Sequence, residues 1–286
     1  MAEHLNPILG RETEICRFAA APEPWQLAKC VETDFVFLLN PPSYEEVATT
    51  FAWEKSFVEE AQARSANEPL VSFVSEQSKR FRSHFFRRRD KVFQLARRDL
   101  PNKQSLAILD VGSGSGNRAI RFCENLNALG REAVPSGIEI SPAMARKTQS
   151  TFARLGGTVV NQPALEGIRQ LEPESFDIVI MSCYLEHECR PLDVLRHTHS
   201  VLHDDGYILV KVPNFDSINR KVRGNKWCGY RFPDHVNYFT PATLRILAHN
   251  AGFEIVPPRW SDSMPTSDNM YAVLRKRSAR EALKVA

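Results

Sequence analysis

The feature that most constrains this chain is an alternation that begins at Ser105. Short apolar runs, each of strand length, are separated by stretches that mostly have room for a helix or a long loop. The runs cover residues 106–111, 134–140, 158–160, 176–181, 207–212, 253–256 and 270–274. Such alternation is typical of a mostly parallel sheet with helices on both faces. Three prolines and no helical period separate the last two runs, which predicts an antiparallel pair. We therefore predict a doubly wound, seven-stranded α/β sheet with an antiparallel last strand.

The chain before this region has a different texture. Pro22, Pro24, Pro41 and Pro42 punctuate the first 40 residues, for which we predict irregular structure. A helix is expected after Ser43, with Glu46 three residues on completing a capping box, and running to about residue 63. We divide the chain into a helical N-terminal appendage, residues 1–70, and an α/β domain, residues 71–286.

Composition narrows the class of protein. The 286 residues fit one large domain with an appendage, and no apolar run reaches the roughly 18 residues that span a bilayer. A net charge of +3 is too small to indicate nucleic acid by itself. None of the six cysteines forms a CxxC pair, and the start lacks a basic stretch followed by an apolar block. These features predict a cytoplasmic protein with reduced thiols.

The strongest local signal is a glycine-rich loop after the first apolar run. That run ends at Asp110, and glycines follow at positions 112, 114 and 116 before a helical stretch. Glycines allow a sharp turn and a close approach of a ligand, and the next helix points its first amide groups at the bound group. The second run ends in Glu139, whose carboxylate can accept both hydroxyls of a ribose.

Two cofactors fit a glycine loop followed by an acid. A dinucleotide fingerprint requires its third glycine at position 117, where this chain has Asn117. Asp110 would also repel a pyrophosphate at close range, whereas the ammonium and sulfonium of S-adenosylmethionine (SAM) favour an acidic edge. The pattern therefore favours SAM over a nicotinamide dinucleotide.

The segment Asp110-Val-Gly-Ser-Gly-Ser-Gly116 resembles motif I of the class I SAM-dependent methyltransferases, which have a Rossmann-like fold. By this resemblance the loop lines the methionine part of SAM, and Glu139, with Ile140 beside it, holds the ribose. The cofactor residues that it implies here are Asp110, Gly112, Ser113, Gly114, Gly116, Glu139 and Ile140.

A second segment, residues 175–187, resembles the "FDxVxxxxxLEH" stretch of the same family. It implies that Ser182 and Tyr184 lie near the cofactor and His187 near the point of methyl transfer; a purely structural histidine is the alternative. The family commonly has an aspartate that contacts the adenine between the third and fourth strands. Here Gln162 offers a side-chain carbonyl instead.

The stretch from Lys226 to Phe253 is similar to one methyltransferase subgroup, "W…P-x-H-x-x-x-F-(S/T)". That subgroup includes relatives of ubiquinone-biosynthesis O-methyltransferases and enzymes acting on sugars and glycans. The resemblance places His235 on the acceptor side, in acceptor binding or proton removal; a loop held by aromatic packing is the alternative. Thr240 is expected to cap the next helix, with Pro241 at its first position.

Members of that subgroup often begin with a zinc-binding "CxxCG…CxxCG" module leading into "VFLNPRP". Residues 35–46 match the second part, but Cys16 has no partner at 19 and Cys30 none at 33. Two thiolates are too few for a closed zinc site. We therefore predict no bound metal.

A second expected helix, residues 69–100, carries nine Lys and Arg residues between 79 and 98. They form either a solvated face over the acceptor site or a surface for an acidic acceptor or nucleic acid.

We predict a SAM-dependent methyltransferase acting on a small-molecule or glycan acceptor, at oxygen, with His187 and His235 as the catalytic candidates. A nicotinamide-dependent oxidoreductase, a SAM-binding regulator without catalysis and a nucleic-acid methyltransferase are the alternatives.

Overall fold

A computed structural model describes residues 2–18, 21–49, 90–259 and 267–277. Its main feature is a seven-stranded sheet in the order β11-β12-β9-β8-β5-β6-β7. The strands are β5 (Ser105–Val111), β6 (Glu132–Ile138), β7 (Thr158–Val160), β8 (Phe176–Ser182), β9 (Leu202–Pro213), β11 (Phe253–Ile255) and β12 (Asn269–Lys276). The strands from β7 to β9 pair in parallel, and β12 is antiparallel to both β9 and β11. The predicted sheet, including its antiparallel end, is confirmed.

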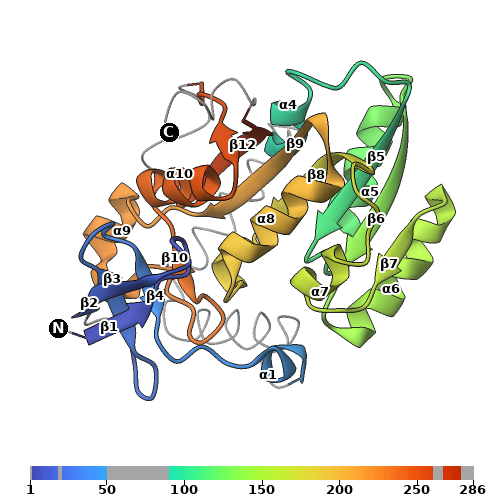
Figure 1. Ribbon diagram of the computed structural model, residues 1–286. Helices are drawn as coiled ribbons and strands as arrows, with labels where there is room; N and C mark the ends of the chain where they lie inside the picture. The colour runs from blue at the N-terminus through green and yellow to red at the C-terminus, as the bar shows by residue number, and fades with distance from the viewer. Residues whose placement is uncertain (1, 19–20, 50–89, 260–266, 278–286) are drawn as a thin grey trace, which may run out of the picture.

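Helices cover both faces of this sheet (Figure 1). They are α4 (Lys91–Ala96), α5 (Asn117–Asn127), α6 (Pro142–Phe152), α7 (Ala164–Ile168), α8 (Pro191–Val201) and α10 (Pro241–Asn250). A further helix, α9 (Ile218–Arg223), lies to one side of the sheet (Figure 1). Single turns η1 (Ala153–Leu155), η2 (Leu185–His187) and η3 (Gly224–Lys226) follow α6, β8 and α9, respectively. Apolar side chains of α4 and α5 pack on one face, and those of α7, α8 and α10 on the other. The central strands β5 and β8 are therefore buried on both sides, as a parallel sheet requires.

The start of α10 follows the sequence closely. Thr240 accepts a hydrogen bond from the backbone N–H of Thr243 at 3.2 Å, the Thr243 hydroxyl accepts one from the Thr240 N–H at 2.9 Å, and Pro241 takes the first position. This reciprocal cap satisfies two amide groups that the first turn leaves without partners. The predicted cap and the placement of His235 in the loop before this helix are both confirmed.

The N-terminal region forms a second, antiparallel sheet in the order β1-β2-β3-β4-β10. Its strands are β1 (Ala2–Leu5), β2 (Glu12–Phe18), β3 (Leu27–Cys30), β4 (Val36–Leu38) and β10 (Asn237–Tyr238). The prediction of irregular structure over the first 40 residues is wrong. Pro22, Pro24, Pro41 and Pro42 all lie between or after strands β1 to β4, where they interrupt no ladder.

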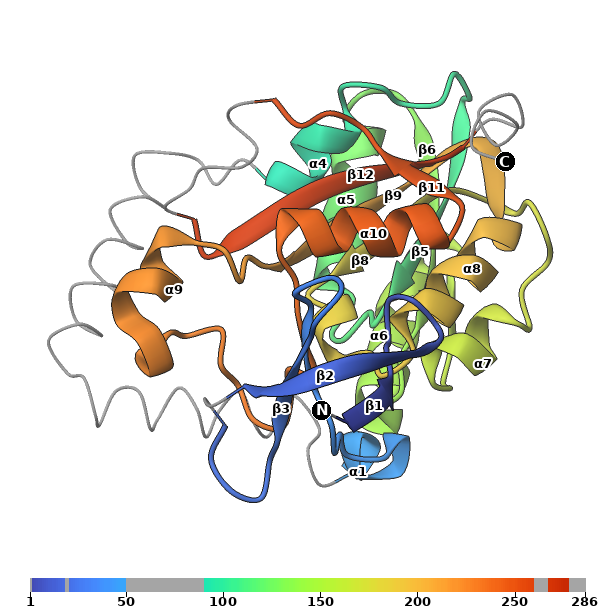
Figure 2. The same cartoon turned by 60° about the vertical axis from the view of Figure 1, so that its left-hand side comes forward.

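The fifth strand of this sheet comes from the other end of the chain. β10 pairs with β4, and the Phe239 ring next to it lies 5.3 Å from the ring of Phe35. Phe35, Phe37 and Ile8 share one apolar cluster with α8 and α10. Figure 2 shows β1, β2 and β3 below α10, beside α1 (Tyr44–Thr49). The N-terminal strands are thus packed onto the main domain through the loop that carries His235.

Some expectations fall on parts of the chain that the structure does not describe. The helix expected after Ser43 begins at Tyr44, but its continuation beyond Thr49 lies outside the described residues. In the basic segment at 79–98, the residues before 90 also lie outside the described residues, and of its nine cations only Lys91, Arg97 and Arg98 are described. Among the described helices, none combines the length and the apolar character needed to cross a membrane.

Candidate active site

A cavity of about 540 Å³ lies where β5, β6 and β8 end, and α1 closes one side of it. Ligands of open α/β sheets bind outside the carboxyl ends of the strands, and this volume is typical of a site for a small molecule. Six segments of the chain line the cavity. They contribute Pro42, Tyr44 and Val47; Asp110, Gly112 to Ser115, Asn117 and Arg118; Ile138 to Ser141; Gln162 to Ala164; Ser182 to Tyr184 and His187 to Cys189; and Arg231, Asp234 and Val236.

The glycine loop forms the floor of the cavity. Gly112 and Gly114 have φ values of +69° and +53°, a conformation that glycine adopts without strain. The amide groups of Gly112 and Ser113 donate to the Ile138 carbonyl at 2.9 and 3.1 Å, which holds the loop against the end of β6. A Cβ atom added to Gly112 would lie 2.7 Å from Cδ2 of Tyr184. Gly112 therefore forms a cradle for the Tyr184 ring, and any larger residue at this position would displace that ring.

The third glycine has a different role from the one expected. Gly116, with φ +72°, caps α5 and does not line the cavity. A Cβ there would lie 2.8 Å from Thr148 and 2.9 Å from Phe152, both on α6. Gly116 therefore allows α5 and α6 to pack closely, and the interpretation that it lines the methionine part of the cofactor is not supported by its position.

Glu139 joins the loop to the second strand. Its buried carboxylate accepts hydrogen bonds from the backbone N–H of Gly114 at 2.7 Å and of Ser141 at 2.9 Å, one on each oxygen. Each carboxylate oxygen can accept a further bond, so two neighbouring hydroxyls, as on a ribose, can be bound. Ile140 and Gln162 line the cavity on the same side.

Asp110 is the second carboxylate at this end. Burial raises its pKa to about 7, with Arg118 opposing the rise and Glu139 adding to it. Two hydroxyl oxygens nearby, the Oγ atoms of Ser113 and Ser182, are buried and have no hydrogen-bond partner among the described residues. A polar ligand carrying a cationic amine would stabilise the ionised carboxylate and pair with these hydroxyls. The residues present therefore fit the amino-acid part and the ribose of SAM.

The opposite wall contains a buried carboxylate that the sequence did not reveal. Glu188 accepts hydrogen bonds from the hydroxyls of Tyr44 and Tyr184 and from the backbone N–H of Arg190 at 2.8 Å. It is 3% exposed, and burial raises its pKa. Tyr44 belongs to α1, so this group ties the N-terminal region to the cavity wall. No sequence signal links side chains 144 positions apart.

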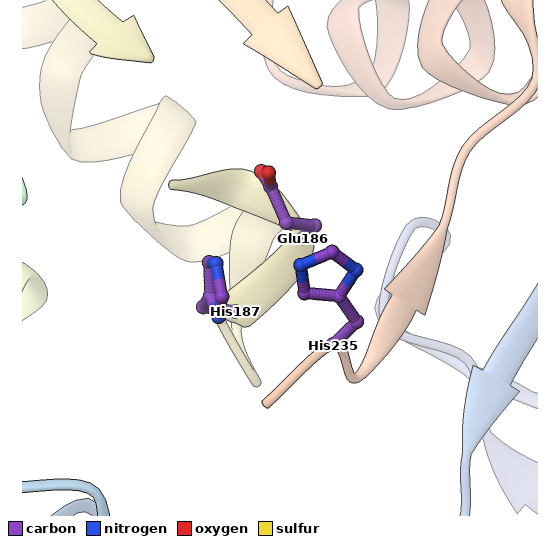
Figure 3. Close-up of side chains that lie close together, drawn as sticks. All are labelled: Glu186, His187 and His235. Atoms are coloured by element: carbon purple, nitrogen blue, oxygen red, sulfur yellow. The ribbon is translucent and has the colours of Figure 1, made fainter. Parts of the chain in front are cut away.

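His187 and His235, predicted from separate segments, lie together with their ring centroids 4.8 Å apart and their planes at 83°. Nδ1 of His187 bonds to the Asp234 carbonyl and Nδ1 of His235 to the Gly229 carbonyl, each at 2.8 Å. Figure 3 shows Glu186 beside the two rings. His187 lines the cavity, whereas His235, 5% exposed, lies behind it and is not part of the lining.

Burial sets the charge of this cluster. It lowers the pKa of His187 to about 4 and that of His235 well below its usual value, and Arg231 lowers both further. The pKa of Glu186 rises to about 8 by burial, against the opposing charges of Lys211 and Arg231. Both imidazoles are therefore neutral at pH 7. With Nδ1 bonded to a carbonyl in each ring, Nε2 is the nitrogen that can accept.

The two cysteines of the N-terminal region lie in ordinary surroundings. Sγ of the buried Cys30 is 3.5 Å from the Thr13 hydroxyl, and Sγ of Cys16 is 3.6 Å from the Lys29 carbonyl. Each cysteine has a threonine three positions away, Thr13 before Cys16 and Thr33 after Cys30. A threonine thus stands where a CxxC pair would have its other cysteine. All six cysteines of the chain are free thiols.

Comparison with known proteins bears on the cavity just described. A family model described as a methyltransferase domain matches residues 79–257, more than half of the chain. A ubiquinone biosynthesis O-methyltransferase of Cupriavidus pinatubonensis is 25% identical over 176 residues, covering 59% of this chain and 68% of that protein.

Solved structures are similar to this chain at low sequence identity. A chain from the complex between the Haloferax volcanii Trm112 methyltransferase activator and the putative methyltransferase has a TM-score of 0.50 at 15% identity, covering 65% of this chain and 88% of its own. A SAM-dependent methyltransferase from Archaeoglobus fulgidus has a TM-score of 0.47 at 22% identity, covering 69% of this chain and 98% of its own.

The chain belongs to the methyltransferase-domain family that matches residues 79–257. It is a methyltransferase. The predicted enzyme class is confirmed, and a nicotinamide-dependent oxidoreductase is set aside.

Proposed function

We propose that this enzyme transfers the methyl group of SAM to a hydroxyl oxygen of a small-molecule or glycan-like acceptor. The observation that carries the proposal is the composition of the cavity wall, which combines the glycine loop, two carboxylates and His187. We assign the part of the cavity at the glycine loop to the cofactor and the part at His187 to the acceptor, and call them the cofactor end and the acceptor end. The name of the Cupriavidus relative, an O-methyltransferase, supports oxygen as the methylated atom.

We assign the cofactor end to a small set of side chains and loop residues. Glu139 holds the ribose hydroxyls, and Asp110 holds the ammonium of the methionine part. Ser113 and Ser182 supply hydroxyl groups, and Gln162 and Ile140 flank the adenine side. The backbone of Gly112 and Gly114 lines the cavity beside the ligand, and Gly112 makes room for the ring of Tyr184.

The protein's contribution to the chemistry is mainly alignment. SAM supplies an activated methyl group on a sulfonium, so the chain has to place an acceptor oxygen in line with the methyl–sulfur bond, which lowers the barrier by several kcal/mol. His187 lies at the cavity wall with Nδ1 fixed by Asp234. As a neutral imidazole it accepts a hydrogen bond from the acceptor hydroxyl and orients the oxygen lone pair.

Isotope transfer tests the proposal. The purified protein is incubated with SAM carrying a ¹³C-methyl group and with three probe classes: a catechol, a nucleotide-linked sugar and an oligosaccharide. We expect a labelled O-methyl resonance in one class and none with a matched acceptor whose hydroxyls are already methylated. A labelled N-methyl or C-methyl product would overturn the assignment to oxygen.

Nucleic acid is the main competing acceptor. Its only support in the sequence is the basic segment at 79–98, most of which lies outside the described residues. Including an RNA and a DNA oligonucleotide among the labelled reactions separates this candidate, and we expect neither to be methylated.

A further inference from the structure

The cluster of Glu186, His187 and His235 brings two imidazole rings and one carboxyl group close together. Their candidate ligand atoms, one from each residue, all lie within 4.8 Å of one another. No other group of three or more such side chains is found in the described parts of the chain. Two imidazoles and one carboxylate are a common ligand set for divalent transition metals, and catalytic zinc uses it with a fourth position open.

The ring nitrogens are arranged as metal ligands require. Each histidine bonds through Nδ1 to a backbone carbonyl, of Asp234 and Gly229 respectively, at 2.8 Å. A metal-binding histidine typically makes this bond with one nitrogen, which fixes the ring and presents the other nitrogen to the ion. In Figure 3 one nitrogen of His235 faces His187, and the Glu186 carboxyl lies to the same side of the two rings.

The third member of the cluster, Glu186, has a carboxyl oxygen that can accept a further partner. Glu186 is 1% exposed, and its Oε2 is buried without a hydrogen-bond partner among the described residues. A buried polar oxygen of this kind is costly unless something pairs with it. Ligands of one ion lie about 3–3.5 Å apart, given metal–ligand bonds of about 2 Å. Binding therefore requires the cluster to contract. When Oε2 moves, it breaks no hydrogen bond to a described residue.

The surrounding charges are mixed. The positive charge of Arg231 acts on all three groups, and that of Lys211 acts on Glu186. The guanidinium of Arg231 is paired with the carboxylate of Asp234 at 3.2 Å, and both side chains are largely buried. Asp234 also provides the carbonyl that holds His187. The ion pair offsets the repulsion that Arg231 would otherwise exert on a cation.

We propose that Glu186, His187 and His235 bind a divalent first-row transition-metal ion, of the zinc type, at the acceptor end of the cavity. This revises the sequence-based prediction of no metal, which considered only the cysteines. Since His187 lines the cavity, an ion held by these residues would be accessible from the cavity.

The inference deepens the proposed function and rests on it for the identity of the ligand that fills the open position. With Nε2 of His187 bound to the ion, the acceptor hydroxyl would bind the ion rather than that nitrogen and would release its proton to solvent. An oxygen lone pair then forms the bond to the methyl carbon as the carbon–sulfur bond breaks. The electron pair of that bond stays on sulfur, which gives S-adenosylhomocysteine and the methyl ether.

Cobalt substitution tests the site directly. The full-length protein is treated with a chelator, dialysed and titrated with Co²⁺, whose visible absorption reports coordination by nitrogen and oxygen. We expect one ion per chain, and a loss of affinity of about 10-fold or more in Glu186→Gln and His235→Gln. His203→Gln, a partly exposed histidine on β9 away from the cluster, serves as the matched control.

Each outcome decides the question. A Co²⁺ spectrum that is absent, or equal in Glu186→Gln and wild type, would overturn the site. Calorimetric SAM affinity, expected to be unchanged in Glu186→Gln, shows that the variant is folded. Because cobalt binding is measured without an acceptor, a bound ion combined with no O-methyl product would contradict the proposed function alone. O-methylation that persists after chelation, with no ion bound, would contradict the metal alone.

Discussion

The two ends of the cavity are built in different ways. Most of the cofactor end is a loop and two strand ends between residues 110 and 141, held mainly by backbone hydrogen bonds to one strand and one carboxylate. Gln162 and Ser182 complete it. The acceptor end consists of buried side chains from α1, η2 and the loop before β10, and these segments are far apart in the chain. Local backbone geometry thus forms the first end, and long-range tertiary contacts form the second.

The largest expected effect is at the glycine loop. Gly112→Ala puts a Cβ 2.7 Å from Tyr184, and we expect methyl transfer to fall about 100-fold because a displacement of this size misaligns the donor. Turnover at saturating SAM measures the loss of methyl transfer, and calorimetry measures the affinity for SAM.

Gly130→Ala is the matched control, since Gly130 has φ +76° and a Cβ added to it would meet no atom within 4 Å. It shares the cost of a left-handed conformation but not the collision. Equal losses in both variants would show that backbone strain, rather than the cradle, accounts for the effect.

Asp110→Asn is expected to weaken SAM binding by about 10-fold at pH 7.5, because the ammonium of SAM loses its carboxylate partner. The pKa of Asp110 is raised to about 7 by burial, so the free enzyme carries a neutral carboxyl below pH 6. SAM affinity of the wild type should therefore rise between pH 6 and pH 7.5.

In Asp110→Asn the carboxyl group no longer titrates. The pH dependence of SAM binding that remains is then due to SAM itself. Comparing the two profiles by calorimetry isolates the contribution of Asp110. Profiles of equal slope would contradict a role for its charge at the cofactor end.

At the acceptor end, Glu188→Gln should reduce the free energy of unfolding by about 2 kcal/mol, since charged hydrogen bonds to two tyrosines are replaced by neutral ones. Chemical denaturation measures the stability. We also expect turnover to fall by about 10-fold, because Tyr184 and α1 lose their common anchor.

Tyr44→Phe removes one of the two hydroxyls and separates the contribution of α1 from that of Tyr184. An unchanged stability in Glu188→Gln would show that the carboxylate does not hold the acceptor wall together.

The smallest effect is expected away from both ends. Thr240→Ala removes the cap of α10 and should cost about 1 kcal/mol of stability, a shift in Tm of about 2–4 °C. SAM affinity should stay at the wild-type value. A loss of SAM binding in this variant would mean that α10 supports the cofactor end, contrary to the division described above.

This division also explains what the sequence could predict. The seven apolar runs indicated the main sheet because its central strands are buried on both faces and therefore read as continuous apolar segments. Asp110, Gly112 and Glu139 could be placed because turn geometry and strand ends are local properties of the chain. Gly116 was misinterpreted because a glycine needed for helix packing and one needed for ligand approach look the same in a sequence.

The acceptor end was predicted only in part. His187 and His235 were found from separate motifs, but their contact, and the participation of Glu186, depend on how two loops fold together. Tyr44 and Glu188 carried no signal, because their pairing depends on tertiary packing. The N-terminal strands were missed because they are short and separated by prolines. The same sequence pattern is typical of loops.

The pairing of β4 with β10 has a consequence for how the protein assembles. Phe37 and Asn237, partners in that ladder, are 200 positions apart in the chain. Contacts of such separation close slowly and form after local structure. During synthesis the strands β1 to β4 leave the ribosome long before β10 exists, so the edge of β4 is exposed until almost the whole chain has been made. We expect the glycine loop to be organised early, and the histidine-bearing wall to be the last part of the enzyme to reach its native form.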